Sequence, residues 1–302
     1  LRRIDLLPRP KLNSSHEGLI RIKELMVPAL FGVSVTQINL LFDTFIASLL
    51  ITGSVSWLYF SDRLMELPLG IFGVAIAVVI LPALSRKHAE SSTKEFSETL
   101  DWALRLVCLI AIPSTIGLIL LSEPLLATLF QNENFSANDV ISAAGSLRAY
   151  AFGLLAFMSI KVFSPGYFSR QNTRTPVRIG IIAMFLNMVM NIVFYLNGMA
   201  HVGLALATSI AAFVNAGLLF FGLIKERVFS FQSGWIRYSI QLLFANLILA
   251  IFLIYYVEEL SIWLNWQAAT KILQLGILVF GGIFIYFVSL LVLGFRWRHI
   301  HR

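Results

Sequence analysis

The chain lacks several features that soluble, secreted and metal-binding proteins use for stability or chemistry. Only 13% of its 302 residues are charged, about half the share of a soluble domain. Cys108 is the single cysteine, so no disulfide can form within the chain. The five histidines show no spacing typical of a metal site. Alternation of apolar and polar residues, the pattern of membrane barrel strands, is also absent. These absences exclude a disulfide-stapled domain and a membrane β-barrel.

What the chain has instead is long apolar runs. It is 58% hydrophobic, with a mean hydropathy of +0.82. A helix needs roughly 20 apolar residues to cross a bilayer and satisfies all its backbone groups internally. Eight runs qualify: Val27 to Leu50, Ser56 to Leu84, Ala103 to Leu121, Val140 to Phe163, Val177 to Leu196, Val202 to Ile224, Tyr238 to Val257 and Ile272 to Leu293. The sequence predicts an all-α polytopic membrane protein of about eight transmembrane helices.

The basic residues predict its orientation. If the amino end is cytoplasmic, 18 of the 23 Lys and Arg residues fall on the cytoplasmic side, whereas the opposite connections hold only Lys271 at a helix edge. Lys and Arg favour the cytoplasmic side of a membrane. We therefore expect both ends of this chain in the cytoplasm. The net charge of +7 fits this asymmetry and attraction to anionic lipids, and no aromatic-basic pattern indicates nucleic-acid binding.

Residues 1–25 precede the first run. The chain starts with Leu1 and a basic amphipathic stretch rather than a signal peptide, as the interior of a longer protein would. Apolar side chains on one face and Arg and Lys on the other predict a cytoplasmic connector lying in the membrane interface. An unstructured, solvated linker is the alternative.

Three charged residues interrupt the second run: Asp62, Arg63 and Glu66. Arg63 is about seven residues into the span, roughly 10 Å from its outer end at 1.5 Å per residue. A charge at mid-membrane costs at least about 2.5 to 3.5 kcal/mol, so charges there line water, a partner or a ligand. One reading is an arginine held by carboxylates beside a hydrated cavity, where its forked donors bind phosphate. In the other, Arg63 and Glu66 neutralise each other or reach outward.

The same residues carry a family resemblance. The stretch from Ser61 to Ser85, SDRLMELPLGIFGVAIAVVILPALS, preceded by Asn39 to Leu50, NLLFDTFIASLL, resembles the seventh and eighth membrane helices of MurJ (MviN) lipid II flippases. The motif Arg170-Gln-Asn-Thr-Arg-Thr-Pro176 resembles a cytoplasmic loop of that family. The resemblance implies residues 26–226 as the second six-helix lobe of a multidrug/oligosaccharidyl-lipid/polysaccharide (MOP) exporter, and residues 227–302 as an extra helix pair and cytoplasmic tail.

The resemblance also implies a function. Two lobes would surround a cationic cavity that opens alternately to each side, and lipid II, an undecaprenyl-pyrophosphate bearing a disaccharide pentapeptide, would cross the bacterial inner membrane through it. Arg63 would pair with the pyrophosphate, oriented by Asp62 and Glu66, and Arg148 is a further candidate for the phosphate path. The missing N-terminal lobe would be the partner, in a monomer. The extra pair would form a groove for the lipid tail, lined by Leu242, Leu243, Leu247, Ile251 and Ile283.

A second polar set predicts a cation site. Asn187 and Asn191 share a helical face, Thr208 lies in the next span and Asp43 in the first. Carboxylate, amide and hydroxyl oxygens are the ligands that small cations prefer. Some MurJ-family members resemble this set with a sodium site, but Asn191 stands where that pattern has an acid. Coupling to sodium or protons stays open, and hydrogen bonding between helices is an equal alternative. No other cofactor is expected.

Two further charged residues lie near the ends of a predicted span, and other functions are also compatible with the sequence. Arg105 and Glu123, near the ends of their span, are expected at the membrane interface. A drug/cation antiporter of the same superfamily, or a flippase for another polyprenyl-linked oligosaccharide, is the alternative transporter. An enzyme acting on polyprenyl phosphates is a more distant one, because the buried acids cluster with an arginine and no set of catalytic groups is recognisable.

Overall fold

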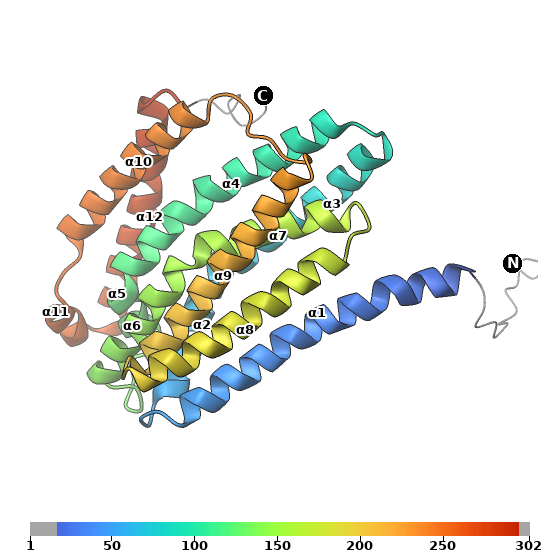
Figure 1. Ribbon diagram of the computed structural model, residues 1–302. Coiled ribbons are helices and arrows are strands. Elements are labelled where there is room, and N and C mark those ends of the chain that lie inside the picture. The colour runs from blue at the N-terminus through green and yellow to red at the C-terminus, as the bar shows by residue number, and fades with distance from the viewer. Residues whose placement is uncertain (1–16, 296–302) are drawn as a thin grey trace, which may run out of the picture.

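The computed structural model describes residues 17–295, which form a bundle of helices without a strand in that range (Figure 1). The helices follow one another with short connections. In chain order they are α1 (Glu17–Ser48), α2 (Ser54–Pro68), the π-helical turn η2 (Leu69–Gly73), α3 (Val74–Ala89), α4 (Thr93–Leu120), α5 (Ser122–Leu129), α6 (Ala137–Phe152), α7 (Leu154–Phe168), α8 (Arg174–Leu196), α9 (Ala200–Lys225), α10 (Trp235–Tyr256), α11 (Leu260–Asn265) and α12 (Ala268–Val292).

The helices match the predicted spans. Within the described residues, seven helical segments are long and apolar enough to cross a membrane, and α1 carries the first predicted span as far as Ser48. The all-α membrane fold is thereby confirmed. Of the predicted connector 1–25, the first 16 residues lie outside the described part, and residues 17–25 form the start of α1. Most of the predicted cytoplasmic tail, residues 296–302, also lies outside it.

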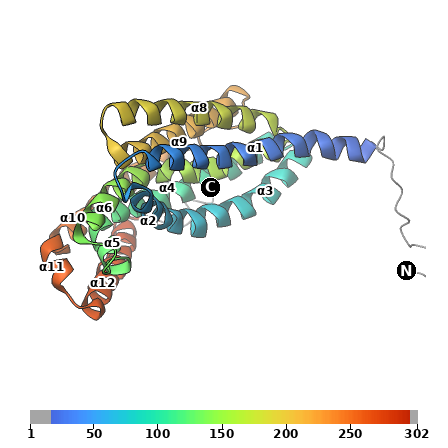
Figure 2. The same ribbon diagram turned by 90° about the horizontal axis from the view of Figure 1, so that it is seen from below.

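The first six spans form one bundle, and α10 and α12 form a pair at its edge. α8 and α9 lie on one side of the bundle, α2 and α3 lie on the opposite side, and α1 runs along α8 (Figure 2). α10 and α12 pack on each other at the edge of the bundle, with α10 against α4 and α12 against α5. The predicted extra pair is therefore attached to the other six spans through α4 and α5.

Regular α-helix is interrupted in two spans where the sequence removes a backbone donor or a side chain. Pro68 cannot donate to the preceding turn, and the five-residue π-helical turn η2 follows it directly. The span beginning at Ala137 divides at Gly153 into α6 and α7. A Cβ at Gly153 would lie 2.6 Å from the Ser209 Oγ atom of α9, so the close approach of these helices requires glycine there.

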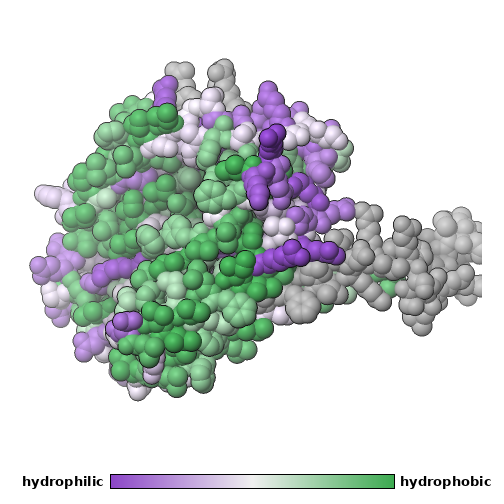
Figure 3. Space-filling model, viewed as in Figure 1, coloured by the Kyte–Doolittle hydropathy of each residue, from purple (hydrophilic) through white to green (hydrophobic). Residues whose placement is uncertain are grey.

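The surface of the bundle is apolar over most of the spans and hydrophilic over one end. Figure 3 shows hydrophobic residues across the flanks and hydrophilic residues gathered where α3 ends and α4 begins. Large apolar side chains such as Phe284, Val292 and Ile236 are more than two thirds exposed, which is favourable only in contact with lipid or protein. The chain is a multi-pass membrane protein.

Candidate functional site

The position of Arg63 is set by two hydrogen bonds that hold α2 against α6. The Trp57 Nε1 atom donates to the Asp139 Oδ1 atom at 2.8 Å. One turn further along, the Ser61 Oγ atom donates to the Ala143 carbonyl at 2.7 Å. Both Trp57 and Ser61 are buried. Because these residues fix one face of α2 in the bundle, Arg63 lies on a face that the bundle leaves uncovered.

Arg63 and Glu66 form an ion pair on that uncovered face. The Arg63 Nη1 atom lies 2.8 Å from the Glu66 Oε2 atom, and the two side chains are 56% and 48% exposed. The guanidinium also lies over the Tyr59 ring, 5.1 Å from its centre, a cation–π contact. Arg63 donates to one carboxylate, so most of its five N–H donors remain available to another anion.

Asp62 lies on a different side of α2. It is half-buried and lies within electrostatic range of Glu66, Arg63 and Asp43 of α1. Among the described residues it forms no ion pair, so Glu66 is the acid that holds the arginine.

Arg148, on α6, bonds to a different acid. Its Nη2 atom lies 2.6 Å from the Glu123 Oε1 atom at the start of α5, and both side chains keep partial exposure. The pair connects two helices that are neighbours in the bundle. Like Arg63, Arg148 uses one carboxylate and remains accessible.

The four residues of the predicted cation site come together, although they lie on three helices. The Asn191 Nδ2 atom donates to the Asp43 Oδ1 atom at 2.5 Å and lies 3.0 Å from the Asn187 Oδ1 atom. The Asn187 Nδ2 atom lies 3.1 Å from the Thr208 Oγ1 atom. Asn39 joins the set by donating to the Asp43 Oδ2 atom at 3.1 Å. We call Asn39, Asp43, Asn187, Asn191 and Thr208 the polar cluster.

The polar cluster is buried and contains one carboxylate. Asn187 and Asn191 are at most 1% exposed. The Asn191 Oδ1 atom has no hydrogen-bond partner among the described residues. If the Asn187 amide is turned over, it donates to the Asp43 Oδ1 atom at 3.0 Å and accepts from the Thr208 hydroxyl at 3.1 Å. The polar cluster contains oxygen atoms of the kind that bind a small cation. Its hydrogen bonds also link α1, α8 and α9 without a bound cation.

An apolar groove of about 390 Å³ lies between α10 and α4. Three of the predicted groove residues line it, Leu242, Leu243 and Leu247, together with Asn246 and the α4 side chains Cys108, Ile112 and Ile116. Ile251 and Ile283 are exposed on the surface and do not line this groove. The facing sides of α10 and α12 are closed, because a Cβ at Gly282 would lie 3.1 Å from Leu249.

One buried charge cluster was not predicted from the sequence. The Arg105 Nε atom lies 2.7 Å from the Asp101 Oδ2 atom, and both side chains are almost fully buried. The Trp235 Nε1 atom donates to the Asp101 Oδ1 atom at 2.6 Å, and Arg105 donates to the Ser233 carbonyl at 2.9 Å. The segment leading into α10 covers Arg105, and its position at the membrane interface stays a prediction. Its spacing from Asp101, four residues on one helical face, was the available signal.

Known proteins resemble the whole described bundle. Residues 1–275 match the family model "Lipid II flippase MurJ". The probable lipid II flippase MurJ of Vibrio cholerae is 47% identical over 98% of this chain and 56% of its own length. That of Haemophilus influenzae is 44% identical over 99% and 60%. The lipid II flippase MurJ of Burkholderia cenocepacia is 36% identical over 100% and 59%.

Solved structures share the fold at lower identity. A lipid II flippase MurJ in an inward closed conformation superposes with a TM-score of 0.75 at 24% identity, over 100% of this chain and 59% of that one. An outward-facing multidrug transporter of the MOP superfamily superposes with a TM-score of 0.61 at 17% identity, over 89% of this chain and 63% of that one. The chain spans less than two thirds of the length of these relatives. With nine tenths of its residues inside the family model, the chain belongs to the MurJ lipid II flippase family.

Proposed function

We propose that the protein containing this chain flips lipid II, or a closely similar polyprenyl-pyrophosphate oligosaccharide, from the cytoplasmic to the periplasmic leaflet of the bacterial inner membrane. It acts as a transporter, and the relatives named above carry that activity in their names. The polar headgroup cannot cross hydrocarbon unaided, because an unpaired charge there carries a large desolvation cost. A protein cavity that supplies polar partners removes that cost.

The observation that carries the proposal is the accessible Arg63–Glu66 pair. A guanidinium in an apolar span, more than half exposed, must face water or an anion rather than lipid. Its free donors match the oxygens of a pyrophosphate, which arginine binds through paired hydrogen bonds. Glu66 holds the side chain in place, the Asp62 carboxylate adds a second negative charge within electrostatic range of it, and Arg148 provides a second cation for the same headgroup.

The remaining parts of the proposal concern the whole transporter. Residues 26–226 form the second lobe of two, and an N-terminal lobe completes the cavity and alternates its access. Both ends of this chain face the cytoplasm, and the protein works as a monomer. The groove between α10 and α4 holds the apolar tail, since it is lined almost wholly by carbon. Residues 227–302 thus carry the tail site.

The test is depletion and rescue in cells with the full-length protein. Arg63→Ala should insert at wild-type levels, fail to rescue growth and leave lipid II in the inner leaflet, as read by a reagent that reaches only the outer one. A matched control is Arg237→Ala, an arginine of α10 outside the proposed cavity, which should rescue. A normal amount of lipid II in the outer leaflet of Arg63→Ala cells would contradict the assignment of Arg63 to the substrate site. A drug-efflux phenotype with normal lipid II would favour the antiporter alternative.

A second proposal concerns coupling. The unpartnered Asn191 Oδ1 atom and the Asp43 carboxylate give the polar cluster the oxygens to hold a monovalent cation. We expect sodium, compared with choline at equal ionic strength, to raise the unfolding temperature of the wild type but not of Asp43→Ala. An equal sodium response in both proteins would leave the polar cluster with the hydrogen-bonding role alone.

A further inference from the structure

The uncovered face of α2 carries a stripe of polar and aromatic side chains. Its members, which we call the α2 stripe, are the exposed residues Ser56, Tyr59, Arg63 and Glu66. They follow one another at intervals of three or four residues, which places them on one side of the helix. Tyr59 is 54% exposed and precedes Arg63 by one turn, about 5.4 Å along the axis. Because charges in an apolar span face water or an anion rather than lipid, Tyr59 adjoins the same aqueous space as Arg63.

Aromatic neighbours hold the Tyr59 ring beside the guanidinium. Its centre lies 5.6 Å from that of the Phe60 ring, and the two planes meet at 73°. Phe60 in turn packs against Phe130 at 4.5 Å and against Phe135 at 5.2 Å, both in the segment between α5 and α6. The bundle thus fixes the position of the Tyr59 ring while leaving much of the residue uncovered. A ring held in this way loses little freedom when a ligand binds to it.

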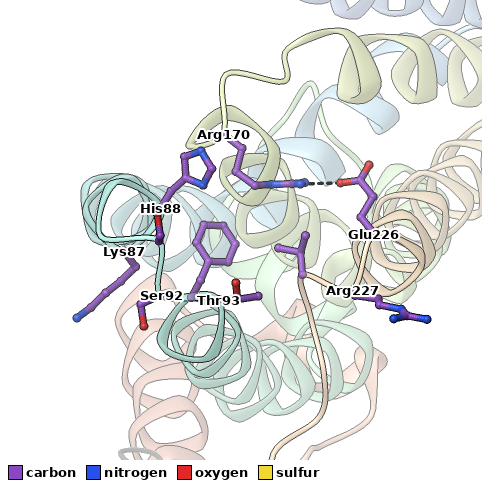
Figure 4. Close-up of a pocket in the computed structure, with 10 residues that line it drawn as sticks. Lys87, His88, Ser92, Thr93, Arg170, Glu226 and Arg227 are labelled. Atoms are coloured by element: carbon purple, nitrogen blue, oxygen red, sulfur yellow. Dashed lines mark hydrogen bonds and ion pairs between the residues drawn. The ribbon is translucent and has the colours of Figure 1, made fainter.

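Two other arginines in the part of the chain that the structure describes lie over tyrosine rings, and those rings are enclosed. Arg170 lies 5.2 Å from the centre of the Tyr167 ring, and Figure 4 shows Arg170 directed at its ion-pair partner Glu226. Arg105 lies 5.7 Å from the centre of the Tyr238 ring. Both tyrosines are at most 2% exposed. The tyrosine of the α2 stripe therefore differs from these two, because a ligand can reach it.

An exposed aromatic ring beside a phosphate-binding arginine suits a phosphate-linked sugar. A pyranose ring presents C–H groups of slight positive charge, which pack on the negative face of an aromatic ring. The phenol hydroxyl can also donate to or accept from the sugar hydroxyls. In a polyprenyl-pyrophosphate oligosaccharide, the first sugar is bonded directly to the pyrophosphate. A pyrophosphate bound by Arg63 therefore brings this sugar close to a ring one helical turn away.

We propose that Tyr59 binds the first sugar of the substrate by stacking against it, while Arg63 binds the pyrophosphate. The inference rests on the proposed function and adds a specificity that a pyrophosphate site alone does not supply, a preference for the glycosylated lipid over bare polyprenyl pyrophosphate. With the amino end in the cytoplasm, as proposed above, α2 begins on the outer side of the membrane. Tyr59 then lies outward of Arg63, and the sugar precedes the pyrophosphate toward the periplasm.

The test compares two lipids that differ by one neutral sugar, with the full-length protein in detergent micelles. The probes are undecaprenyl pyrophosphate and the same lipid bearing a single N-acetylglucosamine, and their dissociation constants are measured by microscale thermophoresis. The wild type should bind the glycosylated lipid about fivefold more tightly. Tyr59→Leu should abolish this preference, whereas Tyr59→Phe keeps the ring and should retain most of it. Tyr255→Leu, at a tyrosine of α10 that is 79% exposed, is the matched control and should keep the full preference.

Arg63→Ala separates the sugar contact from the pyrophosphate site. It should weaken the binding of both lipids about tenfold, and the Tyr59 variants should unfold at the wild-type temperature because the residue is half exposed. A wild type without the preference, or a preference that persists in Tyr59→Leu, would overturn the sugar contact and leave the pyrophosphate site standing. An equal loss of both lipids in Tyr59→Leu would also overturn it, since the ring would then only hold Arg63. Undiminished binding of both lipids by Arg63→Ala would refute the pyrophosphate site and the sugar contact together.

Discussion

Two acid–arginine pairs on the spans have the same chemistry and opposite surroundings. Asp101 and Arg105 are 2.7 Å apart and almost fully buried, and Trp235 and Ser233 bond to them as well. Arg63 and Glu66 are 2.8 Å apart and about half exposed. The first pair is enclosed by protein partners, whereas the second keeps donors free. The difference indicates that the first pair holds helices together, and our proposal is that the second can exchange its partner for a ligand.

The largest effect is expected from breaking the enclosed pair. Asp101→Ala leaves Arg105 buried without its carboxylate, which should destabilise the protein by about 3 to 5 kcal/mol. The measurement is unfolding in detergent, followed by the loss of helical circular dichroism. Glu66→Ala serves as the control and should unfold at the wild-type temperature, because the side chains of its pair face solvent. Equal destabilisation by both substitutions would abolish the contrast between the pairs.

The spacing of Asp101 and Arg105 predicts that they pair, but neighbouring residues in the sequence do not predict that Arg105 is buried. Its partners Ser233 and Trp235 lie about 130 residues later in the chain, and they reach it because α10 packs on α4. Arg63 was identifiable, because a charge far inside an apolar run has few tolerable environments. The spans themselves were predictable from length and hydropathy, because the thickness and the apolar interior of the bilayer dictate both.

Sequence spacing also predicted the polar cluster but not its details. Asn187 and Asn191 share a helical face by spacing alone, whereas the approach of Asp43 depends on α1 packing along α8. Asn39 was missed, although it lies four residues before Asp43 and so on the same face of α1. The predicted groove residues are divided for a similar reason, because Leu242, Leu243 and Leu247 line the groove between α10 and α4, whereas Ile251 and Ile283 do not. The sequence predicted that α10 and α12 form a pair. It did not predict that Gly282 lets the two helices approach so closely that no groove remains between them.

A smaller effect is expected from loosening the enclosed pair without removing a charge. The Tyr238 hydroxyl donates to the Arg105 carbonyl, and Tyr238→Phe deletes that bond while keeping the ring beside the guanidinium. We expect a loss of about 1 kcal/mol in unfolding free energy and unchanged lipid II flipping. A loss of flipping at normal stability would indicate that the α4–α10 contact takes part in transport.

A still smaller change in stability is expected at the intermediate pair, Arg148–Glu123. Both side chains are partly exposed, so Glu123→Gln should change the unfolding free energy by less than about 1 kcal/mol. If Arg148 belongs to the phosphate path, Arg148→Ala should slow lipid II flipping while leaving the protein folded, and Glu123→Gln should slow it less. Equal flipping rates in all three proteins would restrict Arg148 to a contact between α5 and α6.

The most direct test of the contrast between the two ion pairs is Arg63→Lys. This substitution keeps the positive charge and removes the paired N–H donors of the guanidinium. Full-length wild type and variant would be reconstituted in vesicles, and lipid II flipping and unfolding temperature measured on the same preparations. We predict an unchanged unfolding temperature and strongly reduced flipping, since lysine cannot bind a pyrophosphate through paired donors. Normal flipping, or a lowered unfolding temperature that accounts for the loss, would contradict a direct role of Arg63 in substrate binding.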